Sequence, residues 1–377
     1  MKRVIVIGAG PMGLEAALLC GARGFDVTVL ERDEVGASLL QWGATRAFSP
    51  LAMNVSARAR AIVGGLDDAA LLTGPELVER VLVPLGRSAP LAGRVRARHR
   101  VISVGRARMR RDELAGHPLR GERAFRVLVE TPEGERVFES DAVLDASGVY
   151  GQPLWLGAGG VPALGERAIG ARVVRRLGEL HARLPEWKDK RVLLVGHGHS
   201  AAHAAALIAG GASALVWAVR AANARPVADV AADPLPERAA VVARANAIAA
   251  APPANVKIER RAHVEAIAVD GAALAVMLSG ERRVVVDEIV ALTGFRPDTS
   301  LAGELAVELS PATEGAARLA RAVADVTDCL SVPSVRAGDL ASGEPGFALV
   351  GHKSYGRSRA FLLQTGLAQL ETIVASL

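Results

Sequence analysis

Residues 4–13 of the chain read VIVIGAGPMG, a run of four apolar residues that leads directly into the spacing Gly-x-Gly-x-x-Gly. A continuous apolar run of this kind is typical of a parallel strand that is buried on both faces. Gly8 permits a tight turn, Gly10 lets a pyrophosphate approach the backbone, and Gly13 lets the next helix pack closely on the sheet. The stretch therefore predicts a strand, a turn and a helix whose N-terminus binds a dinucleotide.

The residues after this turn complete the pattern of a dinucleotide-binding fold. Residues 14–21 are typical of a helix, and residues 27–30, VTVL, predict a second strand that ends at Glu31. A carboxylate at this point can accept hydrogen bonds from the ribose of adenosine. A lone glycine motif is weak evidence, but a strand, a helix, a second strand and an acid in this order favour dinucleotide binding over an ordinary glycine turn.

A second glycine-rich turn follows later in the chain. Residues 191–195, RVLLV, predict a buried strand that runs into the turn GHGHSA at residues 196–201. A helical stretch and a further strand at 212–219 follow, and the next residue is Arg220 rather than an acid. An arginine can pair with the 2′-phosphate of NADP, which a carboxylate would repel. The pattern predicts NADPH rather than NADH, with Arg225 nearby; the alternative is that Arg220 is an ordinary surface residue.

Three histidines, His197, His199 and His203, lie within or just after this second turn. A metal ion there would compete with the phosphates of the cofactor, and no carboxylate completes a ligand set. We therefore predict that the chain binds no metal.

The composition is typical of a globular α/β protein. The 377 residues suffice for two or three domains, and 50% of them are hydrophobic. The net charge of +5 comes mostly from arginines that are spread along the chain and offset by 40 acidic residues, so we expect no nucleic-acid partner. No signal peptide is evident and no apolar run reaches about 18 residues, so we expect a cytoplasmic protein without a membrane segment.

Two further segments complete an ordered set of four motifs. Residues 141–148, DAVLDASG, and residues 287–298, DEIVALTGFRPD, each predict a strand that closes on a turn of small residues. The set resembles the flavoproteins with two dinucleotide-binding domains, the superfamily of thioredoxin-reductase-like enzymes and flavin-dependent monooxygenases. The resemblance implies an α/β fold with two Rossmann-like, three-layer domains. The first domain would bind FAD, and the second, inserted within the first, would bind NADPH.

The same resemblance implies where the domains begin and end. The FAD-binding domain would comprise residues 1–155 and 290–377, and residues 156–289 would form a connector and the NADPH-binding domain. The motifs and the resemblance together predict cofactor contacts at Gly8, Gly10, Pro11, Met12, Gly13, Glu31, Arg32, Trp42, Val101, Ala146, Ser147, Gly148, Gly196, Gly198, His199, Ser200, Ala201, Arg220, Gly294, Gly351 and His352.

A narrower resemblance rests on residues 42–54, which include WGATRAFSP, and on residues 346–357, which include KSYGR. These segments are similar to a group of bacterial proteins named flavin-binding monooxygenases, some of them linked to arsenic-resistance operons. Because the two segments are expected near the flavin ring, they supply the candidates for the substrate pocket: Met53, Asn54, Lys353, Tyr355 and Arg357. For each of them, the alternative is an ordinary structural role or FAD binding.

Three motifs of the superfamily are missing from this chain, and their absence limits the reactions that it can catalyse. Thioredoxin reductases carry C-x-x-C in the nicotinamide domain, whereas this chain has only Cys20 and Cys329, which cannot form that dithiol. The F-x-G-x-x-x-H motif of classical flavin monooxygenases is absent, and residues 159–166 occupy its place. The usual Gly-Asp of the last FAD segment reads Gly351-His352, so that carboxylate contact is lost.

Three hypotheses for the reaction remain open. In the first, a C4a-hydroperoxyflavin oxygenates a small soft nucleophile at nitrogen, sulfur or arsenic, so the partners are O2 and a small molecule, and the protein must mainly exclude water. In the second, the chain is an NADPH-dependent reductase or dehydrogenase without a redox-active disulfide; Cys329 could take part, although a single cysteine is usually inert packing. In the third, the chain is a flavin redox sensor without turnover. A homodimer is compatible with all three.

Overall fold

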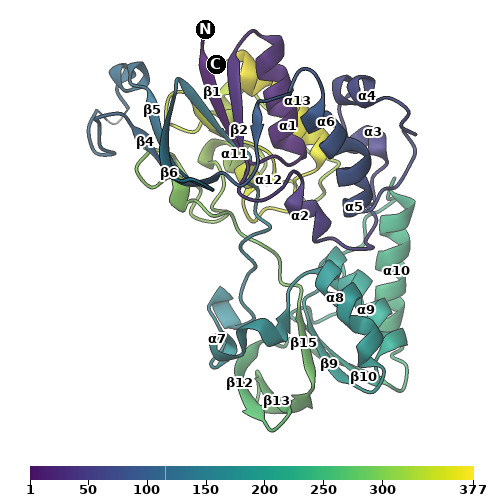
Figure 1. Ribbon diagram of the computed structural model, residues 1–377. Coiled ribbons are helices and arrows are strands. Elements are labelled where there is room, and N and C mark those ends of the chain that lie inside the picture. Colours follow the sequence, from purple (N-terminus) through teal and green to yellow (C-terminus); the bar gives the residue numbers. More distant parts are fainter. Residues whose placement is uncertain (115) are drawn as a thin grey trace. The chain divides into compact units, whose positions relative to one another are not determined.

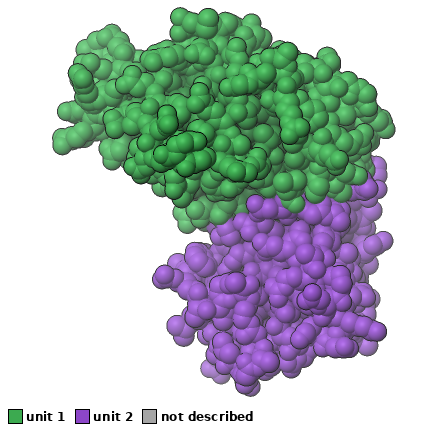
Figure 2. All heavy atoms as spheres, viewed as in Figure 1, with its two compact units in different colours: residues 1–40, 49–152, 295–377 green, residues 41–48, 153–294 purple. Residues whose placement is uncertain are grey.

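The computed structural model describes residues 1–114 and 116–377, and its chain divides into two compact units (Figures 1 and 2). Unit 1 comprises Met1–Leu40, Ser49–Gln152 and Phe295–Leu377. Unit 2 comprises Gln41–Phe48 and Pro153–Gly294. The two segments of unit 2 thus alternate along the chain with the three parts of unit 1, and each unit has a parallel sheet of its own. The predicted α/β class with two Rossmann-like domains is confirmed.

The observed boundaries differ from the expected ones at residues 155 and 290. The second expected boundary falls inside the strand β15 (Glu288–Ala291), which pairs on both sides with strands of unit 2. Gln41–Phe48, expected in the first domain, belongs to unit 2. There a Cβ added to Gly178 would lie 2.2 Å from the carbonyl oxygen of Gln41, so these segments can meet only because residue 178 has no side chain.

Unit 1 is built on a five-stranded sheet in the order β16–β7–β1–β2–β3, with every pair parallel. The central strand β1 has four buried apolar residues in succession, as predicted for a strand covered on both faces. The strands of this sheet are β1 (Arg3–Ile7), β2 (Asp26–Leu30), β3 (Val95–Arg96), β7 (Ala142–Asp145) and β16 (Phe347–Leu349).

Two further layers accompany this sheet (Figure 1). Helices α1 and α13 pack against each other, and α1 lies on β1 and β7. An antiparallel sheet of β4, β5 and β6 contacts the parallel sheet through β6 and β1. Alternate residues of β5 are buried, which is the pattern of a strand with one face against the core. The bounds are α1 (Pro11–Ala22), α2 (Ala37–Leu40), α3 (Leu51–Asn54), α4 (Ala57–Val63), α5 (Gly74–Leu77), α6 (Val83–Arg87), β4 (Arg100–Arg106), β5 (Phe125–Thr131), β6 (Gly134–Ser140), α11 (Ala317–Ala322), α12 (His352–Tyr355) and α13 (Leu363–Ala375).

The C-terminal helix α13 begins at Leu363. The short helix α12 precedes it and ends at Tyr355, and the next residue, Gly356, has a φ of +62°, a left-handed conformation that glycine adopts at little cost.

Unit 2 is built on a parallel sheet in the order β11–β10–β9–β15–β8, beside an antiparallel sheet of β12, β13 and β14. Helices α9 and α10 pack against each other, and α9 also packs on β9 and β10. The two-residue strand β8 was not predicted, because two valines between arginines give no detectable period. The bounds are α7 (Glu166–Ile169), β8 (Val173–Val174), α8 (Leu177–Arg183), β9 (Arg191–Val195), α9 (His199–Gly211), β10 (Ala214–Val219), α10 (Pro236–Ala250), β11 (Val256–Arg260), β12 (Val264–Asp270), β13 (Ala273–Leu278) and β14 (Arg282–Val286).

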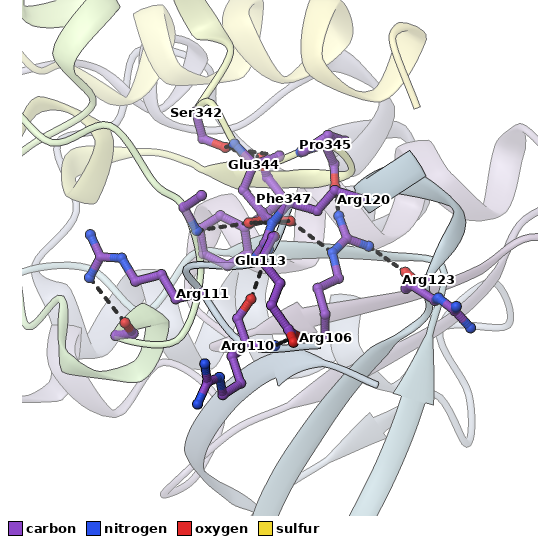
Figure 3. A network of polar contacts seen from close by, with 12 residues as sticks. Arg106, Arg110, Arg111, Glu113, Arg120, Arg123, Ser342, Glu344, Pro345 and Phe347 are labelled. Carbon is purple, nitrogen blue, oxygen red and sulfur yellow. Dashed lines mark hydrogen bonds and ion pairs between the residues drawn. The ribbon is translucent and has the colours of Figure 1, made fainter. Parts of the chain in front are cut away.

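A buried carboxylate, Glu344, joins three distant segments of unit 1 (Figure 3). It accepts a hydrogen bond from Arg106 Nε at 2.8 Å and another from Arg120 Nε at 2.8 Å, and all three side chains are at most 1% exposed. The backbone N–H of Ala306 donates to the same carboxylate at 2.8 Å. The Arg106 guanidinium also lies 3.7 Å from the centroid of the Phe125 ring. These contacts tie the antiparallel sheet to the segment that enters β16.

No helix within the described residues is both long enough and apolar enough to cross a membrane.

The Glu344 network predicts a large loss of stability in Glu344→Gln. The variant keeps the shape of the side chain but leaves two buried guanidiniums without their anion, which costs about 3–5 kcal/mol. Urea unfolding of the purified protein measures this change. The matched control is Glu308→Gln, because Glu308 pairs with Arg318 while their side chains are 46% and 41% exposed; its expected cost is below about 1 kcal/mol. Equal losses in the two variants would contradict the central role of Glu344.

Candidate functional site

The first glycine turn joins β1 to α1 and leaves open space at its middle glycine. Gly8 has a φ of +98°, and a Cβ there would lie 2.9 Å from the carbonyl oxygen of Ala146. A Cβ at Gly13 would lie 1.9 Å from the carbonyl oxygen of Gly8. A Cβ at Gly10, by contrast, would meet no atom within 4 Å. The fold itself requires glycine at residues 8 and 13, whereas the space beside Gly10 fits the close approach of a ligand.

The N-terminus of α1 at this turn is suited to an anion. Gly10 is its N-cap residue, no side chain caps the helix, and its first turn contains no acidic residue. Pro11 at the first helical position has no N–H to satisfy, and the N–H groups that follow it begin the helix without intrahelical partners. These N–H groups and the positive end of the helix dipole attract phosphate. The residues therefore fit the pyrophosphate of a dinucleotide.

Glu31 lies at the carboxyl end of β2 and is held in place by backbone groups. Its carboxylate accepts a hydrogen bond from the N–H of Ala9 at 2.7 Å and another from the N–H of Asp33 at 2.9 Å. Because each carboxylate oxygen can accept more than one hydrogen bond, it can still accept from a ribose hydroxyl. Arg32 is exposed and bonds to Asp33 at 2.9 Å.

The second glycine turn, between β9 and α9, has the same geometry as the first. Gly196 has a φ of +132°, and a Cβ there would lie 2.4 Å from the carbonyl oxygen of Leu292. A Cβ at Gly198 would meet no atom within 4 Å. The N-cap residue Gly198 has φ −84° and ψ −179°, against −82° and −173° at Gly10. Ala201 stands in place of the third glycine and is fully buried. The second turn therefore also fits a dinucleotide.

Arg220 directly follows β10 and is exposed. No hydrogen bond or ion pair joins its guanidinium to another described residue, so the side chain is available to a ligand. Arg225, by contrast, pairs with Asp229 at 2.9 Å. Of the two arginines expected near the second strand, Arg220 is therefore the better candidate for a phosphate contact.

The histidines of the second turn lie among aromatic rings. The His199 ring packs edge-on against Phe48, with centroids 5.9 Å apart, and His203 packs in the same way against His181 at 5.8 Å. Burial lowers the pKa of both His181 and His203, which favours neutral rings. Among the described residues, no group of three or more His, Cys, Asp or Glu side chains is placed to hold a metal ion.

The last predicted FAD segment packs on the first glycine turn. Gly351 has a φ of +67°, and a Cβ there would lie 2.5 Å from Cγ of Met12. His352 follows and stacks on Phe361, with centroids 5.1 Å apart and ring planes at 12°. Burial lowers the pKa of His352 to about 4, so its imidazole is neutral at pH 7. His352 therefore does not replace the missing carboxylate with another charge.

The five candidates for a substrate pocket do not share one environment. Asn54 is buried and donates to the carbonyl oxygen of Ser49 at 2.9 Å, while the neighbouring Met53 is half-buried. Arg357 is exposed and bonds to Glu314 at 2.6 Å.

Tyr355 and Lys353 are buried within unit 1. The Tyr355 hydroxyl accepts a hydrogen bond from Gln369 Nε2 at 2.6 Å, and burial raises its pKa. Lys353 forms an ion pair with Asp145, described below. Apart from Met53, each candidate is thus bonded to another part of the protein.

Other predicted cofactor contacts are spread over both units. Trp42 is half-buried in unit 2, whereas Val101 is buried in β4 opposite Val129. Gly148 and Gly294 lie within the two small-residue motifs, with φ values of +70° and +100°, and Ser200 is exposed in the first turn of α9.

The structure adds one residue that the motifs did not indicate, Asp145 at the end of β7. Its Oδ2 lies 2.6 Å from Lys353 Nζ, and the two side chains are at most 1% exposed. Ser147 joins the pair: its hydroxyl donates to Asp145 Oδ1 at 2.7 Å and accepts from Lys353 Nζ at 2.7 Å. The available signal was an acid at the end of a buried apolar strand, which requires a buried partner.

The glycine geometry predicts that Gly10→Ala and Gly13→Ala have opposite effects. A Cβ at residue 10 meets no protein atom, so we expect a melting temperature within about 4 °C of wild type but the loss of FAD binding. A Cβ at residue 13 collides with the backbone, so we expect unit 1 to lose its stable fold. Thermal unfolding and titration with FAD measure both effects. Normal FAD affinity in Gly10→Ala would show that the open space is not the pyrophosphate site.

Comparisons with known proteins agree with this geometry. A family model described as pyridine nucleotide-disulphide oxidoreductase matches residues 2–352. The bacillithiol disulfide reductase Bdr (YpdA) from Bacillus cereus is 17% identical, with a TM-score of 0.71 over 99% of this chain and 98% of that one. The ornithine N-hydroxylase KtzI from Kutzneria sp. 744 is 16% identical, with a TM-score of 0.65 over 100% of this chain and 98% of that one.

A short stretch also matches a curated protein, the multifunctional alkene reductase/demethylase OYE from Caballeronia cordobensis. The identity is 54% over 44 residues, which are 12% of this chain and only 6% of that protein's length. The family model, in contrast, covers nearly the whole chain. The protein therefore belongs to the pyridine nucleotide-disulphide oxidoreductase family and is a two-domain flavoprotein oxidoreductase.

Proposed function

We propose that the protein is an FAD-dependent monooxygenase that consumes NADPH and oxygenates a small soft nucleophile at nitrogen, sulfur or arsenic. This proposal rests on the burial of Cys20 and on the lack of a disulfide bond between the two cysteines. Cys20 is buried in α1, where burial raises the pKa of its thiol to about 12. Cys329 is half-buried, and neither cysteine forms a disulfide. Because Cys20 is held as a thiol, the chain has no pair of reactive cysteines to relay electrons.

The two glycine turns supply the cofactor sites of this proposal. The turn at Gly10, with Glu31 beside it, would hold FAD, and the turn at Gly198, with Arg220 after the next strand, would hold NADPH. When bound, FAD supplies the redox chemistry, since it can accept a hydride from NADPH and give electrons to O2. The protein contributes binding, orientation and the exclusion of water.

The overall reaction balances without a side-chain nucleophile. NADPH supplies two electrons, one oxygen atom of O2 enters the substrate, and the other leaves as water with the help of one proton from solvent. A nitrogen, sulfur or arsenic atom with a lone pair can accept the oxygen atom directly. A reaction that needs no side-chain nucleophile is consistent with a site where four of the five pocket candidates are hydrogen-bonded or ion-paired to other residues of the protein.

A second function is an NADPH-dependent reductase that passes electrons to an acceptor other than O2. The half-buried Cys329 favours it, because a thiol with some exposure could react with a substrate. Structures with this fold include both a disulfide reductase and an N-hydroxylase, so the fold alone does not choose between the two reactions.

Isotope labelling tests the proposed reaction. The FAD-loaded protein is incubated with NADPH under 18O2 together with primary amines, thiols or trivalent arsenic compounds. We expect one labelled oxygen atom in the product for each NADPH consumed with the true substrate. Products without label, together with NADPH oxidation that continues under nitrogen with a quinone or disulfide, would support the reductase instead. Absence of flavin reduction by NADPH would favour the redox sensor.

The exposed Arg220 predicts a preference for NADPH that one substitution removes. In Arg220→Ala the 2′-phosphate loses a charge-assisted hydrogen bond of about 1.5–3 kcal/mol, which corresponds to a KM for NADPH roughly 10- to 100-fold higher. The KM for NADH should stay unchanged, and anaerobic flavin reduction measures both. The control is Arg283→Ala, an exposed arginine of β14 that pairs with Asp270. A similar rise for both nucleotides would contradict phosphate recognition by Arg220.

A further inference from the structure

Two exposed arginines lie at the carboxyl ends of neighbouring strands in unit 2. Arg220 directly follows β10, and Arg261 directly follows β11. We propose that Arg261 is a second nucleotide-specificity residue, whose guanidinium binds the 2′-phosphate of NADPH together with Arg220. This assignment rests on the proposed function, because it requires NADPH at the second glycine turn.

The strand order brings the adenosine half of a dinucleotide to these two residues. The sheet runs β11–β10–β9–β15–β8, and the glycine turn suited to the pyrophosphate follows β9. In sheets of this kind a dinucleotide lies across the carboxyl ends of the strands, with the adenosine ribose at the end of the strand that follows the glycine turn and its helix. That strand is β10, so the edge strand β11 ends beside the expected site of the 2′-phosphate.

Backbone hydrogen bonds hold Arg261 directly beside the segment that contains Arg220. The N–H of Arg261 donates to the carbonyl oxygen of Ala221 at 3.2 Å, and the N–H of Ala262 donates to the carbonyl oxygen of Val219 at 3.0 Å. The two arginines therefore extend from adjacent segments that are hydrogen-bonded to each other. Because arginine side chains are long and present several donors, two of them on adjacent segments can bind the same phosphate group.

Both guanidiniums are available to a ligand, whereas Arg225 and Arg260 are engaged. No hydrogen bond or ion pair joins the guanidinium of Arg261 to another described residue, and the same holds for Arg220. Arg225 pairs with Asp229 at 2.9 Å, and Arg260 donates through Nε to a carbonyl oxygen of the loop after β10 at 3.1 Å. Arg261, rather than Arg225, is therefore the second arginine that can bind a phosphate at this edge of the sheet.

The charge at the ends of β10 and β11 favours an anion with more than one negative charge. The acids nearest in sequence to the two arginines are Asp229 and Glu259, and both are already paired, Asp229 with Arg225 and Glu259 with Arg282 at 2.6 Å. A phosphate monoester carries a charge of about −1.5 to −2 at pH 7 and offers three acceptor oxygens. Two guanidiniums can neutralise such a group, whereas a single arginine cannot.

The backbone of Arg261 has a conformation that glycine adopts at lower cost. Its φ is +51°, in the left-handed region, where a Cβ is disfavoured. Residues held in such a conformation are found most often at binding and catalytic sites. Replacement by glycine removes the guanidinium and the strain together, so Arg261→Gly tests binding without disturbing the fold.

A pair of nucleotide probes tests whether Arg261 binds the 2′-phosphate. The FAD-loaded wild type and Arg261→Gly are titrated with 2′,5′-ADP, which carries this phosphate, and with 5′-AMP, which lacks it. We expect Arg261→Gly to bind 2′,5′-ADP roughly tenfold more weakly, and 5′-AMP within about twofold of wild type. The KM for NADPH should rise by a similar factor, while the KM for NADH stays unchanged. The melting temperature should not fall, because the lost strain offsets the greater freedom of glycine in the unfolded chain.

Arg108→Gly is the matched control for this variant. Arg108 is also an exposed arginine with a left-handed backbone, at a φ of +56°, but it lies in unit 1. The same substitution there removes one positive charge and the same kind of strain, so both affinities should stay within about twofold of wild type. In Arg261→Lys, which keeps the charge but not the planar set of donors, the affinity for 2′,5′-ADP should be intermediate.

Three results would overturn the assignment. Wild-type affinity of Arg261→Gly for 2′,5′-ADP, together with a loss in Arg220→Ala, would leave Arg220 alone at the phosphate and the proposed function intact. An equal loss of affinity for 2′,5′-ADP and 5′-AMP would place Arg261 at the adenosine instead. An equal loss in Arg108→Gly would reduce the effect to net charge. If the wild type did not distinguish 2′,5′-ADP from 5′-AMP, the NADPH preference of the proposed function would fail, and this assignment with it.

Discussion

A close backbone approach at the first glycine of each turn is the constraint on which both candidate dinucleotide sites depend. In unit 1 the glycine directly after β1 lies against the carbonyl oxygen of Ala146, and in unit 2 the glycine directly after β9 lies against the carbonyl oxygen of Leu292. A Cβ at either glycine would lie within 3 Å of that oxygen. The contact lets each turn be short enough for its helix to begin over the sheet. The helix N-terminus then faces the carboxyl ends of the strands, where an anion can bind.

Buried charges complete the framework of unit 1. The Glu344 network joins the antiparallel sheet to the chain before β16, and the Lys353–Asp145 pair joins α12 to the end of β7. Burying a charge in a protein costs several kcal/mol unless hydrogen bonds compensate it. Glu344 is compensated by two guanidiniums and a backbone N–H, and Lys353 by the Asp145 carboxylate and the Ser147 hydroxyl.

The chemistry of the protein is constrained by what its cysteines can do. Cys20 lies inside α1, and burial keeps it as a thiol, so the two cysteines do not form a dithiol relay. Structures with this fold include a disulfide reductase and an N-hydroxylase, so the fold by itself does not determine the reaction.

The sequence by itself determined the elements of both dinucleotide sites. The buried strands, the glycine turns, Glu31 and Arg220 follow from local patterns, because periodicity, left-handed backbone conformations and strand-end residues are encoded within a few positions. Only the tertiary structure decided that Gln41–Phe48 joins unit 2, that β8 extends its sheet, and that Lys353 lies buried against Asp145. These features depend on pairs of residues that are far apart in the chain, and a single sequence carries no local signal for which distant partner a buried charge or a short strand will find.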